Sequence, residues 1–293
     1  MQHIRDTGGM KIALVLVGLV VLGLVLALLY GRSRWQGGTR QLRTAILAGQ
    51  MKADPSHYDS REVLGLPSPV RRYFEAVLTD GQPMILKMEM EQEGSFNMGE
   101  SVAQWKPFRA SQLNVMQVPG FDWDATIAMM PGVPVFVHDA YVGGQGILQA
   151  ELAGLKSLAS VSGSPEAAEG ELMRFLAEGP WYPTRLLPSQ GVKWEAVSDR
   201  VAKATLVDAG SRCSLEFYFG EDGFVERVHA SARYRTVGEK LVAAPWEGRF
   251  SNYQSRDGMR VPLEGEVSWV LASGVWPYWR GRVTQVRYEF MEK

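Results

Sequence analysis

The chain starts with a long apolar segment and continues with mixed polarity. Residues 12–30 form 19 consecutive positions without a charged side chain. As an α-helix this segment is roughly 28 Å long, which matches the hydrocarbon thickness of a bilayer. A cleaved signal peptide is the alternative, but its apolar region is normally shorter, and no small-residue cleavage site follows Tyr30. We therefore predict an N-terminal tail over residues 1–11 and a retained transmembrane anchor over residues 12–30.

From residue 84 onward, apolar and polar positions alternate with a period of two. Leu86, Met88 and Met90, for example, alternate with charged residues. Strands of this kind are predicted over residues 84–93, 108–117, 121–130, 133–141, 146–152, 193–196, 202–207, 213–219, 223–234, 246–253, 263–271 and 283–290. Glycine and proline pairs between many of them are typical of β-hairpins. About twelve antiparallel strands result from this spacing.

Helical spacing interrupts the strand pattern. Residues 31–65 form a polar juxtamembrane linker in this interpretation, and a helix after Pro69 opens the domain of residues 66–293. A helical insert over about 164–188 begins at Ser164 and runs into a proline-rich stretch. The fold class predicted is mainly β (α+β): an N-terminal transmembrane helix, then a large curved antiparallel sheet or half-barrel with a helical cover.

The composition excludes several classes of function. The formal net charge of −1 leaves no basic excess of the kind that nucleic-acid binding needs. The single cysteine, Cys213, lies in a predicted buried strand and has no second thiol to pair with. His138 and His229 lie in strands, and no two histidines have zinc-site spacing. We therefore expect no nucleic-acid partner, no metal and no cofactor.

Carboxylates are the remaining candidates for chemistry. Asp122 and Asp124 share one face of a strand, about 7 Å apart from the strand repeat, and are interpreted as a solvated face. The predicted helix carries Glu171, Arg174 and Glu178 at spacings that form an intrahelical ion-pair ladder. This polar cluster either holds a polar ligand group or pins the helix to sheet residues, which are Asp139, Arg233 or Arg235.

Several segments resemble known proteins. The sequences of residues 66–74, 105–112, 119–125, 137–146, 170–188 and 246–253 are similar to an uncharacterised bacterial family of membrane-anchored domains of unknown function, over residues 66–288. That resemblance implies no activity. The strand-rich plan with a helical cover is also similar, in architecture alone, to the periplasmic lipoprotein carriers LolA, LolB and LppX. It implies an apolar ligand, such as an acyl chain, and an extracytoplasmic domain.

The leading hypothesis is a non-catalytic, single-pass protein of the bacterial inner membrane that binds a lipid or other apolar molecule between sheet and helix. Its nine tryptophans and thirteen methionines suit an adaptable apolar cavity. The residues expected to line it are Met88, Met90, Phe121, Trp123, Phe175 and Trp181.

Two alternatives remain open. One is a hydrolase-like enzyme on an envelope or membrane-associated substrate, with acid and base among Asp122, Asp124, Asp139, Glu171 and Glu178. The other is an interaction or assembly module. The positive residues on both sides of the anchor lean towards a cytoplasmic domain. The architectural resemblance implies the opposite side, and we take the domain to be extracytoplasmic.

Overall fold

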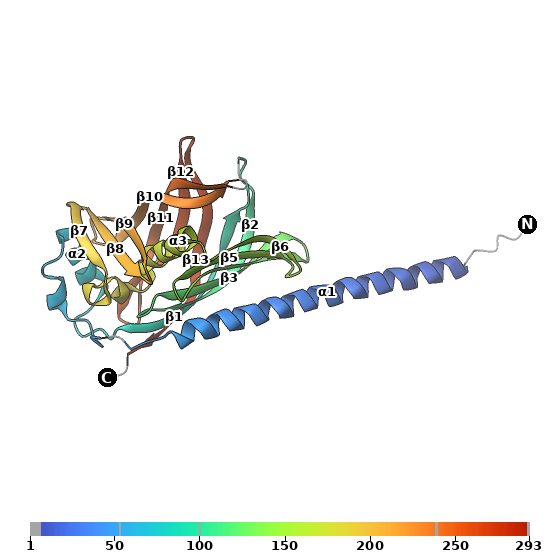
Figure 1. The fold of residues 1–293 in the computed structure, drawn as a ribbon, viewed down its shortest axis with the longest axis horizontal. Helices are drawn as coiled ribbons and strands as arrows, with labels where there is room; N and C mark the ends of the chain where they lie inside the picture. The colour runs from blue at the N-terminus through green and yellow to red at the C-terminus, as the bar shows by residue number, and fades with distance from the viewer. Residues whose placement is uncertain (1–6, 53, 100, 238–239, 292–293) are drawn as a thin grey trace, which may run out of the picture.

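A single large antiparallel sheet forms the body of the protein (Figure 1). The computed structural model describes residues 7–52, 54–99, 101–237 and 240–291. The sheet has 13 strands in the order β6-β5-β4-β3-β2-β1-β13-β12-β11-β10-β9-β8-β7. The strands are β1 (Ile85–Asn97), β2 (Trp105–Val115), β3 (Gly120–Met130), β4 (Val133–Val142), β5 (Gln145–Leu152), β6 (Lys156–Ser162), β7 (Lys193–Ser198), β8 (Val201–Asp208), β9 (Ser211–Phe219), β10 (Val225–Val237), β11 (Lys240–Arg256), β12 (Met259–Leu271) and β13 (Gly274–Phe290).

The predicted curved antiparallel sheet is confirmed, with two differences in its strands. Strand β6 was not predicted, because it is an edge strand whose two faces are both largely exposed, so that it has no apolar alternation. Strand β13 starts at Gly274 rather than at residue 283. Its first half contains Pro277 and Gly281, which obscure the strand pattern in the sequence.

Helical elements cover the concave face and one end of the sheet. Helix α3 (Pro165–Ala177) lies in the concavity and contacts β4, β5, β8, β9 and β10. The Ser164 hydroxyl caps α3 by accepting a hydrogen bond from the backbone N–H of Ala167 at 3.1 Å. Helix α2 (Ser68–Val77) contacts β8 and β12. Four 3-10 turns complete the set: η1 (Ser60–Val63), η2 (Gly179–Trp181), η3 (Pro183–Leu186) and η4 (Pro188–Gln190).

The hydrophobic core occupies the space between the sheet and these helices. Its largest fully buried side chains include Tyr73 of α2, Phe175 of α3 and Phe217 of β9. This packing fixes α3 against the sheet, because the apolar side of the helix is removed from water together with the inner face of the strands.

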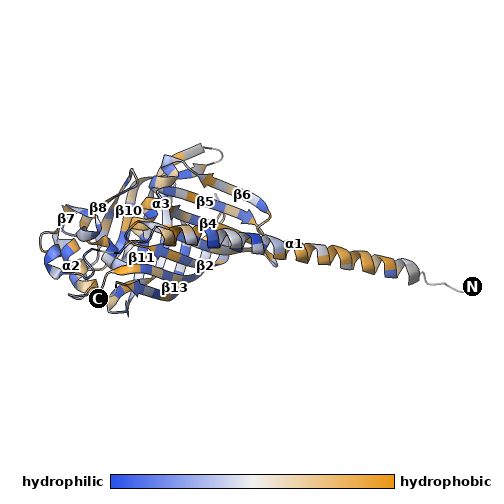
Figure 2. Ribbon diagram, turned by 60° about the horizontal axis from the view of Figure 1, so that its bottom comes forward, coloured by the Kyte–Doolittle hydropathy of each residue, from blue (hydrophilic) through white to orange (hydrophobic). Residues whose placement is uncertain are grey.

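Helix α1 (Thr7–Ala48) is one continuous helix, longer than the predicted anchor. Residues 31–48, which we expected to be the start of a linker, are helical. The apolar part of α1 is exposed and projects from the domain (Figures 1 and 2). Among the described residues, α1 is the one helix whose length and composition suit a membrane span.

The second half of α1 packs on the outer face of β2, β3 and β4. Gly31, Trp35 and Ile46 are its buried positions, and Thr39 and Arg43 are partly buried between them. These five residues follow each other at spacings of three or four, so they form one helix face. Ile46 contributes to a small separate apolar cluster with Leu113, Val115 and Val142.

Candidate functional site

Neighbouring residues of β3 and β4 serve opposite faces of the sheet. Asp122 and His138 face outward, where α1 covers them. Trp123 and Asp139 face inward towards α3. The alternation of side chains along a strand therefore places two different polar networks on the two sides of the same strands.

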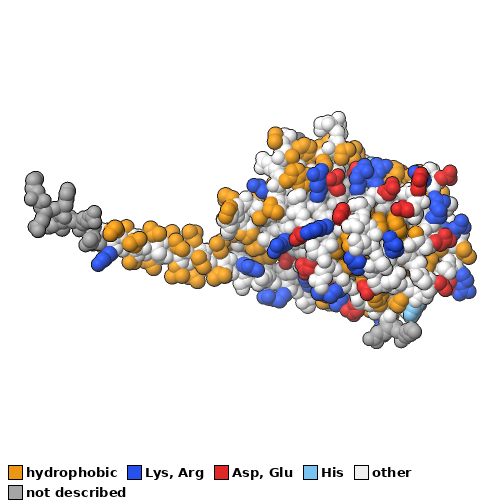
Figure 3. All heavy atoms as spheres, turned by 180° about the vertical axis from the view of Figure 1, so that it is seen from behind, with side chains coloured by type: hydrophobic (Ala, Val, Ile, Leu, Met, Phe, Trp, Pro, Cys, Tyr) orange, Lys and Arg blue, Asp and Glu red, His pale blue; other side chains and the backbone are white. Residues whose placement is uncertain are grey.

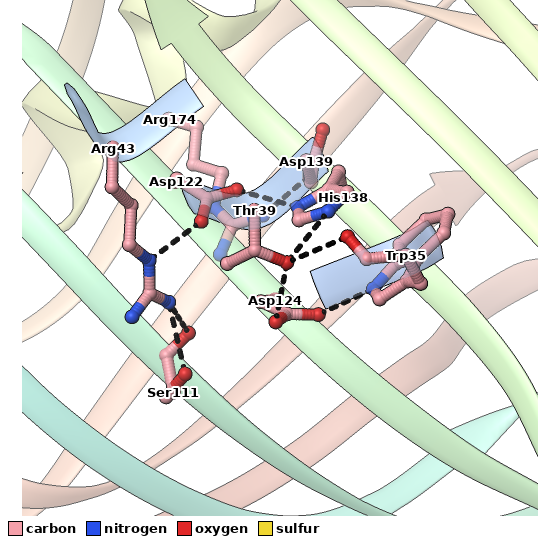
Figure 4. Close-up of polar contacts among 9 residues, drawn as sticks. All are labelled: Trp35, Thr39, Arg43, Ser111, Asp122, Asp124, His138, Asp139 and Arg174. Carbon is pink, nitrogen blue, oxygen red and sulfur yellow. Dashed lines mark hydrogen bonds and ion pairs between the residues drawn. The ribbon is translucent and has the colours of Figure 1, made fainter. Parts of the chain in front are cut away.

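The outer network ties α1 to the sheet (Figure 4). The Arg43 guanidinium donates through Nε to Asp122 Oδ2 at 2.9 Å, and through Nη2 to the backbone oxygen of Ser111 at 3.0 Å. The Trp35 indole donates to Asp124 Oδ1 at 2.9 Å, and the Thr39 hydroxyl donates to Asp124 Oδ2 at 3.0 Å.

The prediction that Asp122 and Asp124 form a solvated face is wrong, because α1 covers them. Asp122 is fully buried, and its Oδ1 lies 2.7 Å from His138 Nδ1. Buried carboxylates need such partners, since an unpaired charge in the interior is costly. His138 is a hydrogen-bonded histidine of the interior, and no zinc-type group surrounds it among the described residues.

Thr39, His138 and Asp122 share the connectivity of a nucleophile, a base and an orienting acid. Thr39 Oγ1 lies 3.2 Å from His138 Nε2. However, the Trp35 ring stacks on the imidazole at 4.3 Å between centroids, and only 1% of the histidine is exposed. A substrate has no access to the imidazole while α1 is docked, so we interpret this network as a structural clamp.

The inner face, in contrast, contains a cavity of about 500 Å³ between α3 and the sheet. This is within the size range of small-molecule pockets in proteins. More of its surface is apolar than polar. Its aromatic lining consists of Phe96, Trp123, Trp181, Tyr234, Trp246, Phe250, Trp269, Trp276, Tyr278 and Trp279.

Hydrogen bonds within the wall satisfy several of these aromatic side chains. The Trp123 indole donates to Gln92 Oε1 at 2.8 Å, and the Trp246 indole donates to the Tyr278 hydroxyl at 2.9 Å. The Trp181 indole N–H is buried and has no partner among the described residues. The polar edges of Trp123 and Trp246 are therefore already paired within the wall, so a ligand would meet these two residues through their apolar rings.

A row of glycines makes room for the tryptophans. Gly94, Gly281 and Gly265 lie side by side on β1, β13 and β12. A Cβ on Gly281 would lie 2.5 Å from the Trp279 ring, so no larger residue fits there without displacing the ring. The glycine row thus allows Trp279 to lie flat against the sheet at the cavity wall.

The predicted polar cluster lies at the α3 side of the cavity. Arg174 donates through Nε to Glu178 Oε1 at 2.7 Å and through Nη1 to Asp139 Oδ2. The same guanidinium lies over the ring of Trp123, at 5.2 Å from its centroid. Arg233 of β10 lies 3.2 Å from Glu171 Oε1. All five charged groups line the cavity.

The polar cluster is electrostatically unusual. Burial raises the pKa of Glu171 to about 8, and the neighbouring Asp139 charge raises it further in the same direction. Burial on its own would lower the pKa of Arg174, but the charges of Glu178 and Asp139 more than offset it, so that this pKa is raised. The cluster therefore combines a carboxyl group that resists ionisation with an arginine whose positive charge is stabilised by its neighbours.

The residues expected to line the cavity separate into two groups. Trp123 and Trp181 line it, with Asp139, Glu171, Arg174 and Glu178. Met88, Met90, Phe121 and Phe175 lie instead in the packed core. The physical cause is that other side chains pack around these four so closely that at most 2% of each is exposed, which leaves no surface for a ligand. The sequence-based reasoning did not assign Trp246, Trp269, Trp276 and Trp279 to the lining, although the aromatic cluster of residues 276–279 was a signal for it.

The donor set does not suggest a metal centre. No group of three or more histidine, cysteine, aspartate or glutamate side chains with metal-binding geometry occurs in the described part of the chain. The arrangement can hold an amphiphile, with a polar group near Arg174 and Glu171 and an apolar part against the tryptophans. Two neighbouring carboxyl groups, of which one has a raised pKa, are also typical of acid–base pairs in enzymes.

Comparison with known proteins gives a family and a distant structural likeness. A crystal structure of a LolA superfamily protein from Nitrosomonas europaea is similar with a TM-score of 0.40 and 11% identity, over 77% of this chain and 94% of that one. The architectural resemblance noted from the sequence is to the same superfamily. Among curated proteins the chain has no match. A family model matches residues 64–288 and confirms the resemblance to a family of unknown function, so the chain belongs to the family of unknown function DUF6920.

Proposed function

We propose that this protein is a single-pass membrane protein whose β-domain binds a lipid or other apolar molecule in the cavity under α3. The observation that carries the proposal is the cavity of about 500 Å³ with ten aromatic side chains in its wall. Clefts of this size with apolar walls and a few polar groups are the usual ligand sites of proteins.

The membrane part of the proposal is supported by α1. Its large apolar residues from Met10 to Tyr30 are exposed, and the same helix continues without a break into the docked residues 31–48. A cleaved signal peptide does not need to continue as one helix into a segment that packs on the domain. Such a continuous helix suits a retained anchor, because it would hold the domain at a fixed place beside the bilayer.

The buried indole of Trp181 supports a ligand with a polar end. The Trp181 N–H is buried without a hydrogen-bond partner among the described residues, and its side chain lines the cavity. A buried donor left unpaired is unfavourable by about 1–3 kcal/mol. A ligand with a hydroxyl, ester or phosphate oxygen near this indole would relieve that cost.

Gly170 offers a test of the cavity. It lies on α3 in the cavity wall, and the nearest atom to a Cβ placed there is Arg233 Nε at 3.8 Å. A Gly170→Phe side chain would project into the cavity without displacing backbone. Gly65 is the matched control, because no atom lies within 4 Å of its Cβ position and it is not part of the cavity.

The measurement is native mass spectrometry of the full chain, purified from membranes in a mild non-ionic detergent. We expect the wild type and Gly65→Phe to carry a co-purified lipid. In Gly170→Phe the amount of bound lipid should fall at least about tenfold, which corresponds to ~1.4 kcal/mol of binding free energy. Repeated recovery of the wild type without any amphiphile, together with no uptake of a fluorescent fatty acid, would contradict lipid binding.

A hydrolase-like activity is the second candidate, and one observation favours it. Glu171, with its pKa raised to about 8, lies near Asp139 in the cavity wall, and a pair of carboxyl groups there suits a general acid and a base. Asp122 and Asp124 drop out as candidates, because α1 covers them. Incubation with lipid or ester substrates distinguishes the two functions: a binding protein returns its ligand intact, whereas an enzyme accumulates product that Glu171→Gln does not form.

The location proposed is the bacterial inner membrane, with the domain outside the cytoplasm. Protease treatment of spheroplasts tests the side. Degradation of the domain in intact spheroplasts is expected, and protection until the membrane is lysed would place the domain in the cytoplasm.

A further inference from the structure

The two ends of the sheet differ in the chemistry of their turns. Because β1 to β6 form an antiparallel meander and β13 pairs with β1, the β1–β2, β3–β4, β5–β6 and β12–β13 turns share one end of the sheet. We call this end the helix-exit end. The β2–β3, β4–β5 and β11–β12 turns lie at the opposite end.

Large apolar side chains are exposed at the turns of the helix-exit end. Val102 between β1 and β2 is 70% exposed, Met130 at the β3–β4 turn 62%, Leu155 in the β5–β6 turn 48% and Val275 at the β12–β13 turn 54%. Single exposed apolar residues are normal on a protein surface. Here, however, four successive hairpin tips at one end each expose a large apolar side chain, a pattern that indicates an apolar partner.

The opposite end serves as an internal comparison. Its turns are made of glycine and charged or buried residues: Gly143-Gly144 between β4 and β5, Asp257-Gly258 between β11 and β12, and the buried Met116 after β2. The β9–β10 turn, with Glu221 and Asp222, lies at this end too. One hairpin at this end, β7–β8, also has an exposed apolar residue, Val197, which is 53% exposed. Exposed apolar tips on successive hairpins are therefore found at the helix-exit end, whereas the opposite end has one such residue among the described turns named here.

Helix α1 leaves the domain at the same end. A Cβ on Gly31 would lie 2.2 Å from the backbone oxygen of Ala153 and 3.0 Å from Leu155, both in the β5–β6 turn. Arg34 donates through Nε to the backbone oxygen of Gly154 at 3.0 Å. The apolar stretch of α1 begins at the next residue towards the N-terminus, Tyr30, and extends away from the domain here (Figures 1 and 3).

The cavity is also lined from this end. Met98, next to β1, and Tyr234, near the end of β10, are exposed and belong to the lining. Trp276 and Tyr278, from the first residues of β13, lie beside them. The cavity is thus bordered by the same hairpins whose tips carry the apolar side chains.

We propose that the helix-exit end is a bilayer-contacting surface, in which the hairpin tips of Val102, Met130 and Leu155 enter the boundary between headgroups and acyl chains. Exposed Lys156 follows Leu155 in the chain, and exposed Arg32 follows Gly31, which contacts the same turn; both side chains suit anionic headgroups. The cavity then opens towards the membrane, so that a lipid passes between bilayer and cavity without crossing water. This inference rests on the membrane anchoring of the proposed function, but the contact of the tips does not depend on a ligand.

Fluorescence quenching in the full-length protein tests this contact. Val102→Cys, Met130→Cys and Leu155→Cys are labelled with an environment-sensitive dye, one at a time, in nanodiscs of phosphatidylcholine and phosphatidylglycerol with spin-labelled acyl chains. Asp222→Cys at the opposite end is the matched control, and Leu22→Cys in α1 reports the anchor itself. Native Cys213 stays unlabelled, because it is buried and burial raises its pKa to about 12.

We expect the spin-labelled lipids to reduce the dye signal severalfold at Leu22, Val102, Met130 and Leu155 and to leave the signal at Asp222 unchanged. If the dye at Leu22 is quenched but the dyes at the hairpin tips are not, as at Asp222, the proposed contact is overturned and the anchor remains. An unquenched Leu22 would contradict the anchor and the contact together. The amount of lipid bound to Gly170→Phe is a separate readout. A failure of lipid binding is therefore distinguishable from a failure of the anchor and from a failure of the hairpin contact.

Discussion

At the scale of single residues, Glu171 has the most unusual environment. Its carboxyl group is buried in the cavity wall beside Asp139 and Arg233. A carboxylic acid whose pKa is higher in the folded than in the unfolded protein binds more protons when folded. Glu171 therefore makes its full contribution to the free energy of unfolding below pH 4.5, the pKa of this carboxyl in the unfolded chain. The contribution is lost as the pH rises towards about 8, the pKa in the folded protein.

Replacement of this acid tests the pH dependence. In Glu171→Gln, the thermal unfolding temperature should depend less on pH between 5 and 8 than in the wild type, where the slope from this one group is at most ~1.4 kcal/mol per pH unit. Differential scanning fluorimetry in detergent measures it. Glu169→Gln, on the same helix but outside the cavity lining, is the control and should keep the wild-type slope. An equal slope in Glu171→Gln and wild type would show that Glu171 is ionised in the folded protein.

Asp122 is the second residue whose environment decides its role. The fully buried carboxylate accepts from Arg43, which is partly exposed, and pairs with His138. Asp122→Asn removes the charge and leaves both partners without their anion, so we expect destabilisation by about 2 kcal/mol. Glu93→Gln breaks the exposed pair with Arg282 instead and should leave the unfolding temperature almost unchanged, because water and salt screen this pair. Equal effects of the two substitutions in thermal unfolding would contradict the clamp.

At the scale of elements, α1 has two halves with different partners. Its first half is apolar around its whole circumference, and its second half carries one buried face that meets β2, β3 and β4. A sharp bend in a helix needs a local break in its hydrogen bonds, so a continuous helix limits how the two halves move relative to each other. The domain is therefore joined to the apolar half of α1 by helix rather than by a flexible linker.

The contact at Gly31 allows a test of this docking. A Gly31→Leu side chain would collide with the backbone of Ala153, so residues 31–48 should separate from the sheet near the β5–β6 turn, with a loss of about 1–3 kcal/mol. Gly38→Leu is the control, since no atom lies within 4 Å of its Cβ position. Hydrogen exchange reports the result: faster exchange of residues 31–48 and 120–126 is expected in Gly31→Leu alone. Unchanged protection would show that the helix accommodates a side chain there.

At the scale of the whole molecule, the domain extends further towards the N-terminus than the family match suggests. The match begins at residue 64, but residues 31–48 cover Asp122, Asp124 and His138. A chain of residues 31–293 should therefore unfold at nearly the temperature of the full chain, whereas residues 49–293 should lose several degrees or fail to fold, because a buried carboxylate and an apolar cluster are exposed. Thermal unfolding followed by tryptophan fluorescence compares them. Equal unfolding temperatures of the two truncated chains would mean that α1 is dispensable for the domain.

Most elements could be predicted from the sequence, because these elements have a local signal, whereas β6 and the second half of α1 do not. Apolar length indicated a helix over residues 12–30, period-two alternation indicated most strands, and Ser164 marked the start of α3. The cluster of Arg174 with Glu178 followed from helical spacing, and Asp139 was one of the sheet partners considered for it.

Only the tertiary structure decided which face of the sheet each helix covers. Asp122 and Asp124 are polar residues on one face of a strand, a pattern that fits a wet face and a covered face equally well. The cover comes from Trp35, Thr39 and Arg43, which lie about 80 residues away in the chain. Likewise, whether a buried methionine or tryptophan lines a cavity depends on how far α3 fills the concavity. Local periodicity records which side of an element is apolar, but the partner of that side is set by packing between distant segments.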